Sequence, residues 1–323
     1  MTIAAVLGAG GAVGHAWHAG VLAAIEDVTG WDARRADLVV GTSAGSMVGA
    51  LLRAGVGPED LFARATDGPL SAEAAAIYDD ARMPSTPTAP PRPRPAVIRG
   101  PASPGILLRS ASRPWRLRPG LVAAAALPRG GADAGIAAVA GALHRHGWPD
   151  EELWVCAVRL SDGERVVFGR EPESRSAVSV GEAVAASCAI PGWFAPISID
   201  GAEFVDGGAH SPTNADLADR PDLDVVVVSS PMSLDRTALR RPAVDRIWRI
   251  GHRISLQREV AALRRRGATV LTIQPGLDDL EVMGGTASAM DPGRRASVAT
   301  TARRTVRARL ESPRLRDLLA HVR

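Results

Sequence analysis

The feature that most constrains the fold is the segment Gly41–Gly45, Gly-Thr-Ser-Ala-Gly, which joins an apolar run to a stretch with helical periodicity. Leu38–Val40 precedes it, and apolar side chains recur over Met47–Leu52. Small residues allow a tight turn from a strand into a helix, where a larger side chain would clash. Such a turn exposes its central hydroxyl, here Ser43, at a helix N-terminus, where the helix dipole adds positive potential.

The same alternation of apolar strands and helical stretches continues along most of the chain. Ile3–Leu7 is predicted as a first strand ending in glycines, and His15–Val28 follows with helical spacing. Alternation of this kind is the signature of a mostly parallel sheet covered by helices. We therefore predict an α/β fold, a three-layer sandwich in which the Gly41–Gly45 turn follows the second strand. Further predicted strands are 153–160 with 165–169 and 197–200 with 203–205, each pair forming a hairpin, and also 223–229 and 269–274. Further predicted helices are 43–53, 58–78, 105–115, 133–146, 180–187, 244–266 and those from 292 to 323.

Length and composition favour one large core. The chain has 323 residues, 46% of them hydrophobic and 23% charged, and shows no internal repeat. We predict one main domain over residues 1–275 and an arginine-rich helical extension over 276–323 that packs on it. Pro84–Pro104 is crowded with proline and poor in apolar residues, which predicts a loop or disordered segment within the domain.

Charge and composition exclude several classes of protein. The chain has no lysine, so its 38 basic residues are all arginine, and neither a P-loop nor Schiff-base catalysis is available. The net charge of +3 is small and dispersed, which does not favour nucleic acid as a partner. Arg264–Arg266 could contact anionic lipid headgroups at a membrane surface, although a solvated helix face is the simpler interpretation.

The cellular compartment of the protein is predicted from its two cysteines and from its first ten residues. Cys156 and Cys188 lie far apart in apolar surroundings and form neither a metal-binding spacing nor a disulfide framework. Met1–Gly10 lacks the basic region and cleavage site of a signal peptide. No run reaches the ~18 apolar residues of a membrane span. We expect a cytoplasmic protein that contacts membranes at most peripherally.

Two familiar interpretations of the N-terminal motifs, a dinucleotide-binding loop and a Ser-Asp-His hydrolase, fit the sequence poorly. A dinucleotide-binding loop would place its third glycine at Val13, but the glycine comes one residue late at Gly14, and no carboxylate follows the second strand. A Ser-Asp-His hydrolase would need a histidine beyond the acid, and only His252 and His321 are candidates. His252 is predicted in mid-helix between arginines, at a surface position. His15 and His18, on the first helix, are expected to pack or cap.

A third interpretation needs no histidine. A carboxylate can activate a hydroxyl directly if the two touch in a site that excludes water, because desolvation makes the acid more basic. Asp206, in the sequence Phe204–Gly208, ends a predicted strand and is followed by two glycines. This places its side chain at a strand end, although an ordinary Asp-Gly turn would have the same sequence.

These residues, taken together and in this order, resemble the patatin-like phospholipases, serine lipid acyl hydrolases with a Ser–Asp dyad. The resemblance rests on the glycine-rich loop Ala9–Gly14, the elbow Gly41–Gly45 and the Asp-Gly-Gly motif Asp206–Gly208, supported by Ala185–Gly192. It spans Ile3 to about Ile273, with the proline-rich segment and the end of the chain outside it.

The resemblance implies Ser43 as the nucleophile and Asp206 as its base. The amides of Gly10, Gly11 and Ala12 would form the oxyanion hole, because glycines let backbone N–H groups point together at a developing negative charge. The supporting motif residues would be Gly14, Gly41, Gly45, Gly207 and Gly208.

The implied substrate is a lipid or lipid-like acyl ester, with no metal and no cofactor. Two departures, Ala9 for the first loop glycine and Val13 for the usual basic residue, concern substrate preference rather than the dyad. The alternative is a catalytically silent lipid-binding or scaffolding protein with the same fold. Headgroup, acyl-chain and positional specificity, and the oligomeric state, do not follow from the sequence.

Overall fold

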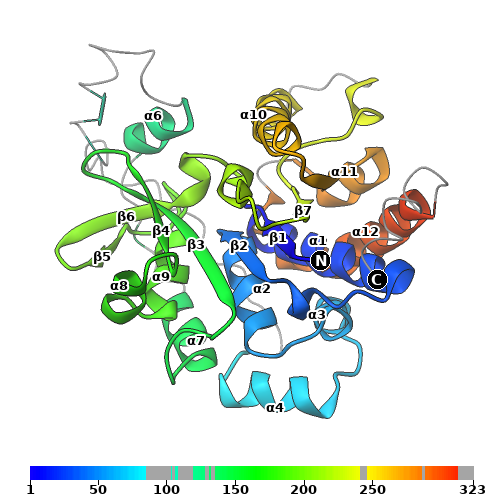
Figure 1. The fold of residues 1–323 in the computed structure, drawn as a ribbon, viewed down its shortest axis with the longest axis horizontal. Coiled ribbons are helices and arrows are strands. Elements are labelled where there is room, and N and C mark those ends of the chain that lie inside the picture. Colours follow the sequence, from blue (N-terminus) through cyan, green and yellow to red (C-terminus); the bar gives the residue numbers. More distant parts are fainter. Residues whose placement is uncertain are drawn as a thin grey trace.

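A mixed sheet organises the part of the chain that the structure, a computed structural model, describes (Figure 1). The strands follow the order β5-β6-β3-β2-β1-β7-β8, with β4 beside β3. The described residues are 1–84, 103, 106–107, 119–127, 131, 135–240, 246–285 and 288–311. The strands are β1 Ile3–Leu7, β2 Leu38–Thr42, β3 Glu152–Arg159, β4 Arg165–Phe168, β5 Ile197–Ile199, β6 Ala202–Asp206, β7 Val225–Ser229 and β8 Thr269–Ile273.

The strands at the centre of the sheet are parallel. β1 pairs in parallel with β2 and with β7, β2 with β3, and β7 with β8. β1, β2 and β7 are buried along their whole length, as expected for apolar strands covered on both faces. The prediction of a three-layer α/β sandwich, with a mostly parallel sheet flanked by helices, is confirmed.

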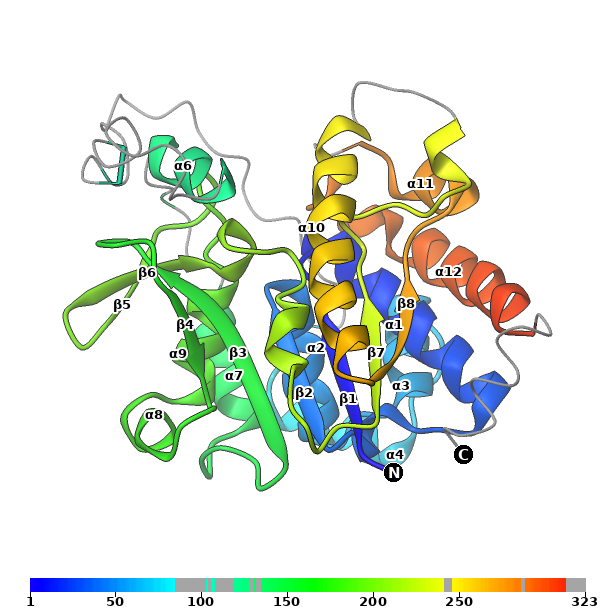
Figure 2. The same ribbon diagram turned by 45° about the horizontal axis from the view of Figure 1, so that its top comes forward.

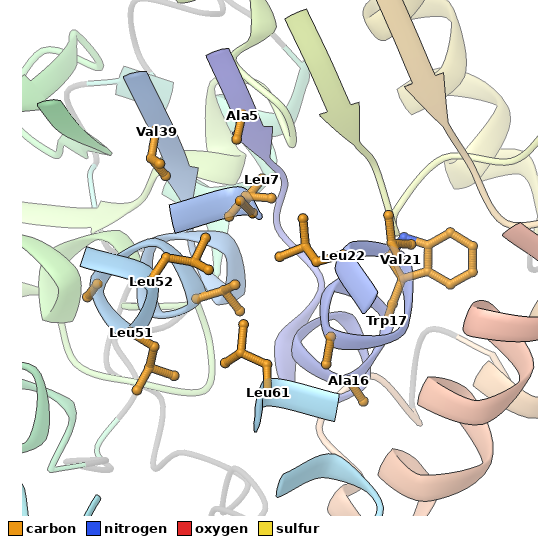
Figure 3. Packing of buried hydrophobic residues seen from close by; sticks show 14 of the residues in the cluster. Ala5, Leu7, Ala16, Trp17, Val21, Leu22, Val39, Leu51, Leu52 and Leu61 are labelled. Atoms are coloured by element: carbon orange, nitrogen blue, oxygen red, sulfur yellow. The ribbon is translucent and has the colours of Figure 1, made fainter. Parts of the chain in front are cut away.

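Helices cover both faces of this sheet (Figure 2). Side chains alternate along each strand, so Ala5 and Leu7 face one layer while Ala4 and Val6 face the other. Figure 3 shows the first layer, where Leu7 and Val39 lie near Leu22, Leu51, Leu52 and Leu61 from three helices. The main helices are α1 Gly11–Thr29, α2 Ala44–Arg53, α3 Pro58–Ala65, α4 Ala72–Asp80, α6 Pro119–Ala126, α7 Ile136–Leu143, α8 Pro172–Ala177, α9 Val180–Ser187, α10 Arg246–Arg265, α11 Leu277–Met283 and α12 Arg295–Leu310.

The order of the strands along the chain determines the direction of helix α10 relative to the sheet. β7 and β8 are parallel neighbours, so the connecting helix α10 has to run back along the sheet, antiparallel to both. The N-terminal half of α10 therefore lies at the sheet edge where parallel strands end. Open α/β sheets place their sites at this edge.

β6 reaches the same edge from the opposite direction. β2 ends with Thr42 opposite Cys156 of β3, but β3 continues beyond that level. β6 pairs antiparallel with this extension and ends with Asp206 opposite Ala157. Asp206 therefore stops close to the level at which β2 turns into Ser43.

The C-terminal helices share the core of the rest of the chain. α12 lies along α1 in both ribbon views (Figures 1 and 2), and Val298, Ala302 and Val306 are buried in the same cluster as Trp17. The approach is close at Gly20, where a Cβ atom would lie 2.2 Å from the carbonyl oxygen of Ala299.

Several local predictions meet a clear outcome. The hairpins β3–β4 and β5–β6 and the helix α9 are confirmed. The predicted single helix over 58–78 is wrong, because Asp67 at φ 57° and Pro69 separate α3 from α4. The proline-rich segment 84–104 lies outside the described residues except for Pro84 and Ser103, as does the end of the chain from residue 312. Among the helices that are described, none has the length and apolar character to cross a membrane.

Candidate active site

The turn between β2 and α2 holds Ser43 in an uncommon backbone conformation. Ser43 has φ 54° and ψ −120°, a region that residues with side chains rarely adopt. Glycine is required at both flanking positions because other backbone atoms approach them too closely for a side chain. A Cβ at Gly45 would lie 2.0 Å from the carbonyl oxygen of Leu7, and one at Gly41 would lie 2.5 Å from Cα of Ser46. The turn is therefore specified by sterics at Gly41 and Gly45.

Hydrogen bonds stabilise this turn from both sides. The Ser43 N–H donates to the hydroxyl oxygen of Ser187 at 2.9 Å, and the Ser46 hydroxyl donates to the Ser43 carbonyl at 2.7 Å. Ser187 ends α9, just ahead of the strand pair that carries Asp206. The two halves of the site are thus joined by a backbone contact as well as by side chains.

Asp206 lies against Ser43 in a buried environment. Ser43 is 3% exposed and Asp206 is 5% exposed. Burial raises the pKa of Asp206 to about 6, although hydrogen bonds from the Ser43 hydroxyl and the Gly208 N–H both act to lower it. The Gly208 N–H donates to Asp206 Oδ1 at 2.7 Å. A Cβ at Gly207 would lie 2.3 Å from the Cys156 carbonyl oxygen, so glycine lets the chain turn there.

Three N–H groups of the glycine loop have no backbone acceptor among the described residues. The N–H groups of Ala9 and Val13 donate to the carbonyl oxygens of Pro212 and Ala289. Between them, in the part of the chain that is described, Gly10, Gly11 and Ala12 donate to no backbone carbonyl, because they open helix α1. This is the amide set expected for an oxyanion hole. The loop is closely covered: Cβ atoms at Gly10 and Gly14 would lie 2.8 and 3.3 Å from Cγ of Pro231.

His18 supports the start of this loop. Its Nε2 atom lies 2.7 Å from the Gly8 carbonyl oxygen and its Nδ1 atom 2.8 Å from the Ser229 hydroxyl. A carbonyl can only accept, so Nε2 carries the proton and Nδ1 accepts from Ser229. Burial lowers the pKa of His18 to about 4, which keeps the ring neutral. His18 has the packing role expected for it.

The loop after the Asp-Gly-Gly motif connects all three parts of the site. Its residue Asn214, buried with φ 51°, donates from Nδ2 to the Thr42 hydroxyl oxygen at 3.0 Å, next to Ser43. The Pro212 carbonyl accepts the Ala9 amide of the glycine loop at 2.7 Å. Arg165 of β4 holds Asn214 and pairs with Asp216.

A carboxylate on α10 holds this loop in place through three hydrogen bonds. Glu259, 7% exposed, accepts the Ser211 hydroxyl at 2.6 Å, the Thr213 hydroxyl at 2.8 Å and the Ala215 N–H at 3.0 Å. Neither Asn214 nor Glu259 was among the residues expected from the sequence. For Asn214 the available signal was the mostly polar segment Ser211–Asn214, shortly after the Asp-Gly-Gly motif.

The histidine alternative gains no support from the surroundings of Asp206. Burial, Ser43 and Gly208 account for its shifted pKa, with no contribution from a histidine. His252 is half-buried rather than on the surface, and its ring lies 5.9 Å from that of Trp248. His321 lies outside the described residues. The described residues also contain no group of three or more His, Cys, Asp or Glu side chains suited to a metal ion.

A family model for patatin-like phospholipase matches residues 5–219. The chain belongs to the patatin-like phospholipase family. The patatin-like match spans the glycine loop, the elbow and the Asp-Gly-Gly motif, and it ends before β7, α10 and β8. A search of curated proteins finds no match. The family consists of lipid acyl hydrolases, so the coarse class of activity is a hydrolase acting on lipid esters.

Proposed function

We propose that the protein hydrolyses acyl esters of lipids, in the manner of a phospholipase A, with Ser43 as nucleophile and Asp206 as its general base. The observation that carries the proposal is that Ser43 and Asp206 are both buried and adjoin each other, so that the Ser43 hydroxyl acts on a carboxyl group whose pKa burial raises to about 6. A carboxylate of that pKa is ionised at neutral pH and is still basic enough to take a proton in a dry site.

Each step of the reaction has a group in the site to perform it. Ser43 Oγ attacks the ester carbonyl carbon while its proton passes to Asp206. The amides of Gly10, Gly11 and Ala12 stabilise the oxyanion. Collapse of the tetrahedral intermediate breaks the bond to the alcohol, which leaves with the proton from Asp206. Water then attacks the acyl-enzyme, again with Asp206 as base, and the fatty acid is released.

Labelling with a fluorophosphonate tests the nucleophile directly. We expect mass spectrometry of the labelled protein to find the phosphonate on Ser43, and Ser43→Ala and Asp206→Asn to lose labelling. Both variants should also lose roughly 10³-fold or more of the hydrolysis of a p-nitrophenyl ester, because members of a catalytic unit do not act additively. Circular dichroism should show both variants folded.

The same experiment separates the alternatives. A catalytically silent lipid-binding protein would leave Ser43 unlabelled and the ester intact. A Ser-Asp-His hydrolase would lose activity with His252→Ala or His321→Ala while Asp206→Asn kept it. Either result would refute the dyad.

A further inference from the structure

The outer side of α10 carries large apolar side chains that face solvent. Ile247 is 67% exposed, Trp248 55%, Ile250 37% and Ile254 44%. Arg249, between them, is buried and turns inward. Exposed apolar residues so close together on one helix are unusual for a surface that contacts only water.

The second half of the same outer side is cationic. Arg258 and Arg265 are exposed and spaced from Ile254 by whole helical turns, so they share its side of the helix. The single acidic residue of α10, Glu259, is buried under Ser211 and Thr213. We call Ile247, Trp248, Ile250, Ile254, Arg258 and Arg265 the α10 surface.

A groove borders this surface along the edge strand β8. It has a volume of about 560 Å³, and four of its lining side chains are Arg236, Arg253, Arg264 and Arg265. Its one acidic lining residue, Asp235, accepts hydrogen bonds from Thr237 and pairs with Arg309. The electrostatic potential beside the exposed apolar side chains of α10 is therefore positive.

The apolar end of α10 adjoins the candidate site. The Arg249 guanidinium donates to the Pro231 carbonyl at 2.6 Å, and the Pro231 ring lies against Gly10. Trp248 lines a small cavity together with Gly10 and Val13. Because α10 runs antiparallel to β7 and β8 (Figure 2), its other end lies at the opposite edge of the sheet.

We propose that the α10 surface docks the protein on an anionic lipid bilayer and brings the glycine loop to the interface. A helix with isoleucine and tryptophan beside arginine is the composition of interfacial helices, which bury the apolar side among acyl chains while arginines bind headgroup phosphates. The positive groove selects an anionic bilayer over an apolar protein surface. The inference rests on the proposed function, since a lipid hydrolase has to reach esters within a bilayer.

Vesicle flotation of the full chain tests the docking. All measurements use the Ser43→Ala background, so that lipid hydrolysis does not enter. We expect flotation with vesicles of phosphatidylcholine and phosphatidylglycerol, weaker flotation with phosphatidylcholine alone, and a loss of binding as salt rises. The Arg258→Gln/Arg265→Gln variant should bind the anionic vesicles roughly thirtyfold less at low salt. Ile247→Ser/Ile254→Ser should reduce binding to both kinds of vesicle at least about tenfold.

A matched charge control is available elsewhere on the chain. Arg35 and Arg82 are exposed on other elements, so Arg35→Gln/Arg82→Gln removes the same charge and should bind like the parent protein. Thermal melting checks that every variant is folded. Equal binding by all variants, or no flotation of the parent, would overturn the proposal. So would a dimer in light scattering that the isoleucine variant dissociates with vesicle binding unchanged, because a second copy would then cover the surface. Labelling of Ser43 by a fluorophosphonate is independent of these results and tests the proposed function separately.

Discussion

Burial at Asp206 opposes the charge that the reaction needs. Desolvation raises its pKa to about 6, and the Ser43 hydroxyl and the Gly208 amide recover part of the cost of the buried charge. The same burial makes the neighbouring Cys188 an unreactive thiol, since it raises that pKa to about 12. At the scale of single residues, one desolvated pocket thus keeps the thiol protonated beside the hydroxyl that we propose as nucleophile.

The raised pKa of Asp206 predicts the acid limb of the pH–rate profile. Only the ionised carboxylate can take the Ser43 proton, so kcat/KM on a soluble ester should fall about tenfold per pH unit below pH about 6. The pH midpoint of this limb should hardly change with temperature, because the ionisation of a carboxyl group has a small enthalpy. The ionisation of a histidine has a larger enthalpy, so a histidine base would shift the midpoint clearly. A limb near pH 4, or one that shifts with temperature, would contradict Asp206 as base.

At the scale of elements, α10 joins the sheet to the loop behind the site. Glu259 of α10 accepts three hydrogen bonds from Ser211, Thr213 and Ala215, and that loop in turn contacts Thr42 and Ala9. The loop follows Asp206 by only a few residues. We therefore expect this buried carboxylate, with its three donors, to position the reacting groups through the loop.

Glu259→Gln tests this role. The amide cannot accept at its nitrogen, so at least one donor loses its partner, and we expect the free energy of unfolding to fall by about 1–3 kcal/mol. Misplacement of the loop should also reduce kcat on a soluble ester about tenfold with little change in KM. Ser255→Ala, on the same helix and away from that loop's hydrogen bonds, is the control and should keep kcat. A loss of stability with kcat intact would leave Glu259 a purely structural role.

At the scale of the whole molecule, α12, the last helix of the described residues, completes the core. α12 lies beyond the residues that match the family model, yet its side chains are buried with those of α1. Gly20 of α1 lies against Ala299 and Ala302 of α12, so this side of α1 would face water without α12. The close approach at Gly20 makes this contact testable.

Gly20→Ala should destabilise the protein. Its Cβ would lie 2.2 Å from the Ala299 carbonyl oxygen, so α12 has to shift, and we expect the free energy of unfolding in urea to fall by about 1–3 kcal/mol. Gly251→Ala is the matched control in mid-helix, with nothing within 4 Å, and should stabilise the protein by up to about 1 kcal/mol through helix propensity. If the two variants had the same effect, α12 would not pack tightly on α1 in solution.

Local chemistry in the sequence was enough for the turn, the hairpins and the order of the motifs. Gly41 and Gly45 could be identified in advance because the sterics of a strand-to-helix turn depend on a few neighbouring residues. The hairpins β3–β4 and β5–β6 were predicted for the same reason. The proximity of Ser43 and Asp206 was one hypothesis from the residues, beside an ordinary Asp-Gly turn, and the resemblance to the family favoured it, since no periodicity relates residues so far apart.

Tertiary structure alone decided how those parts meet. Asp206 stands beside Ser43 because β3 is longer than β2 and β6 returns antiparallel along the extension, a relation set by strand pairing. Glu259 reaches the same loop only because α10 packs under it. Exposure of Ile247 and Ile254 likewise depends on which side of α10 the sheet covers. Short-range steric constraints depend on neighbouring residues and can therefore be identified in the sequence. Long-range contacts arise only from the packing of the whole chain.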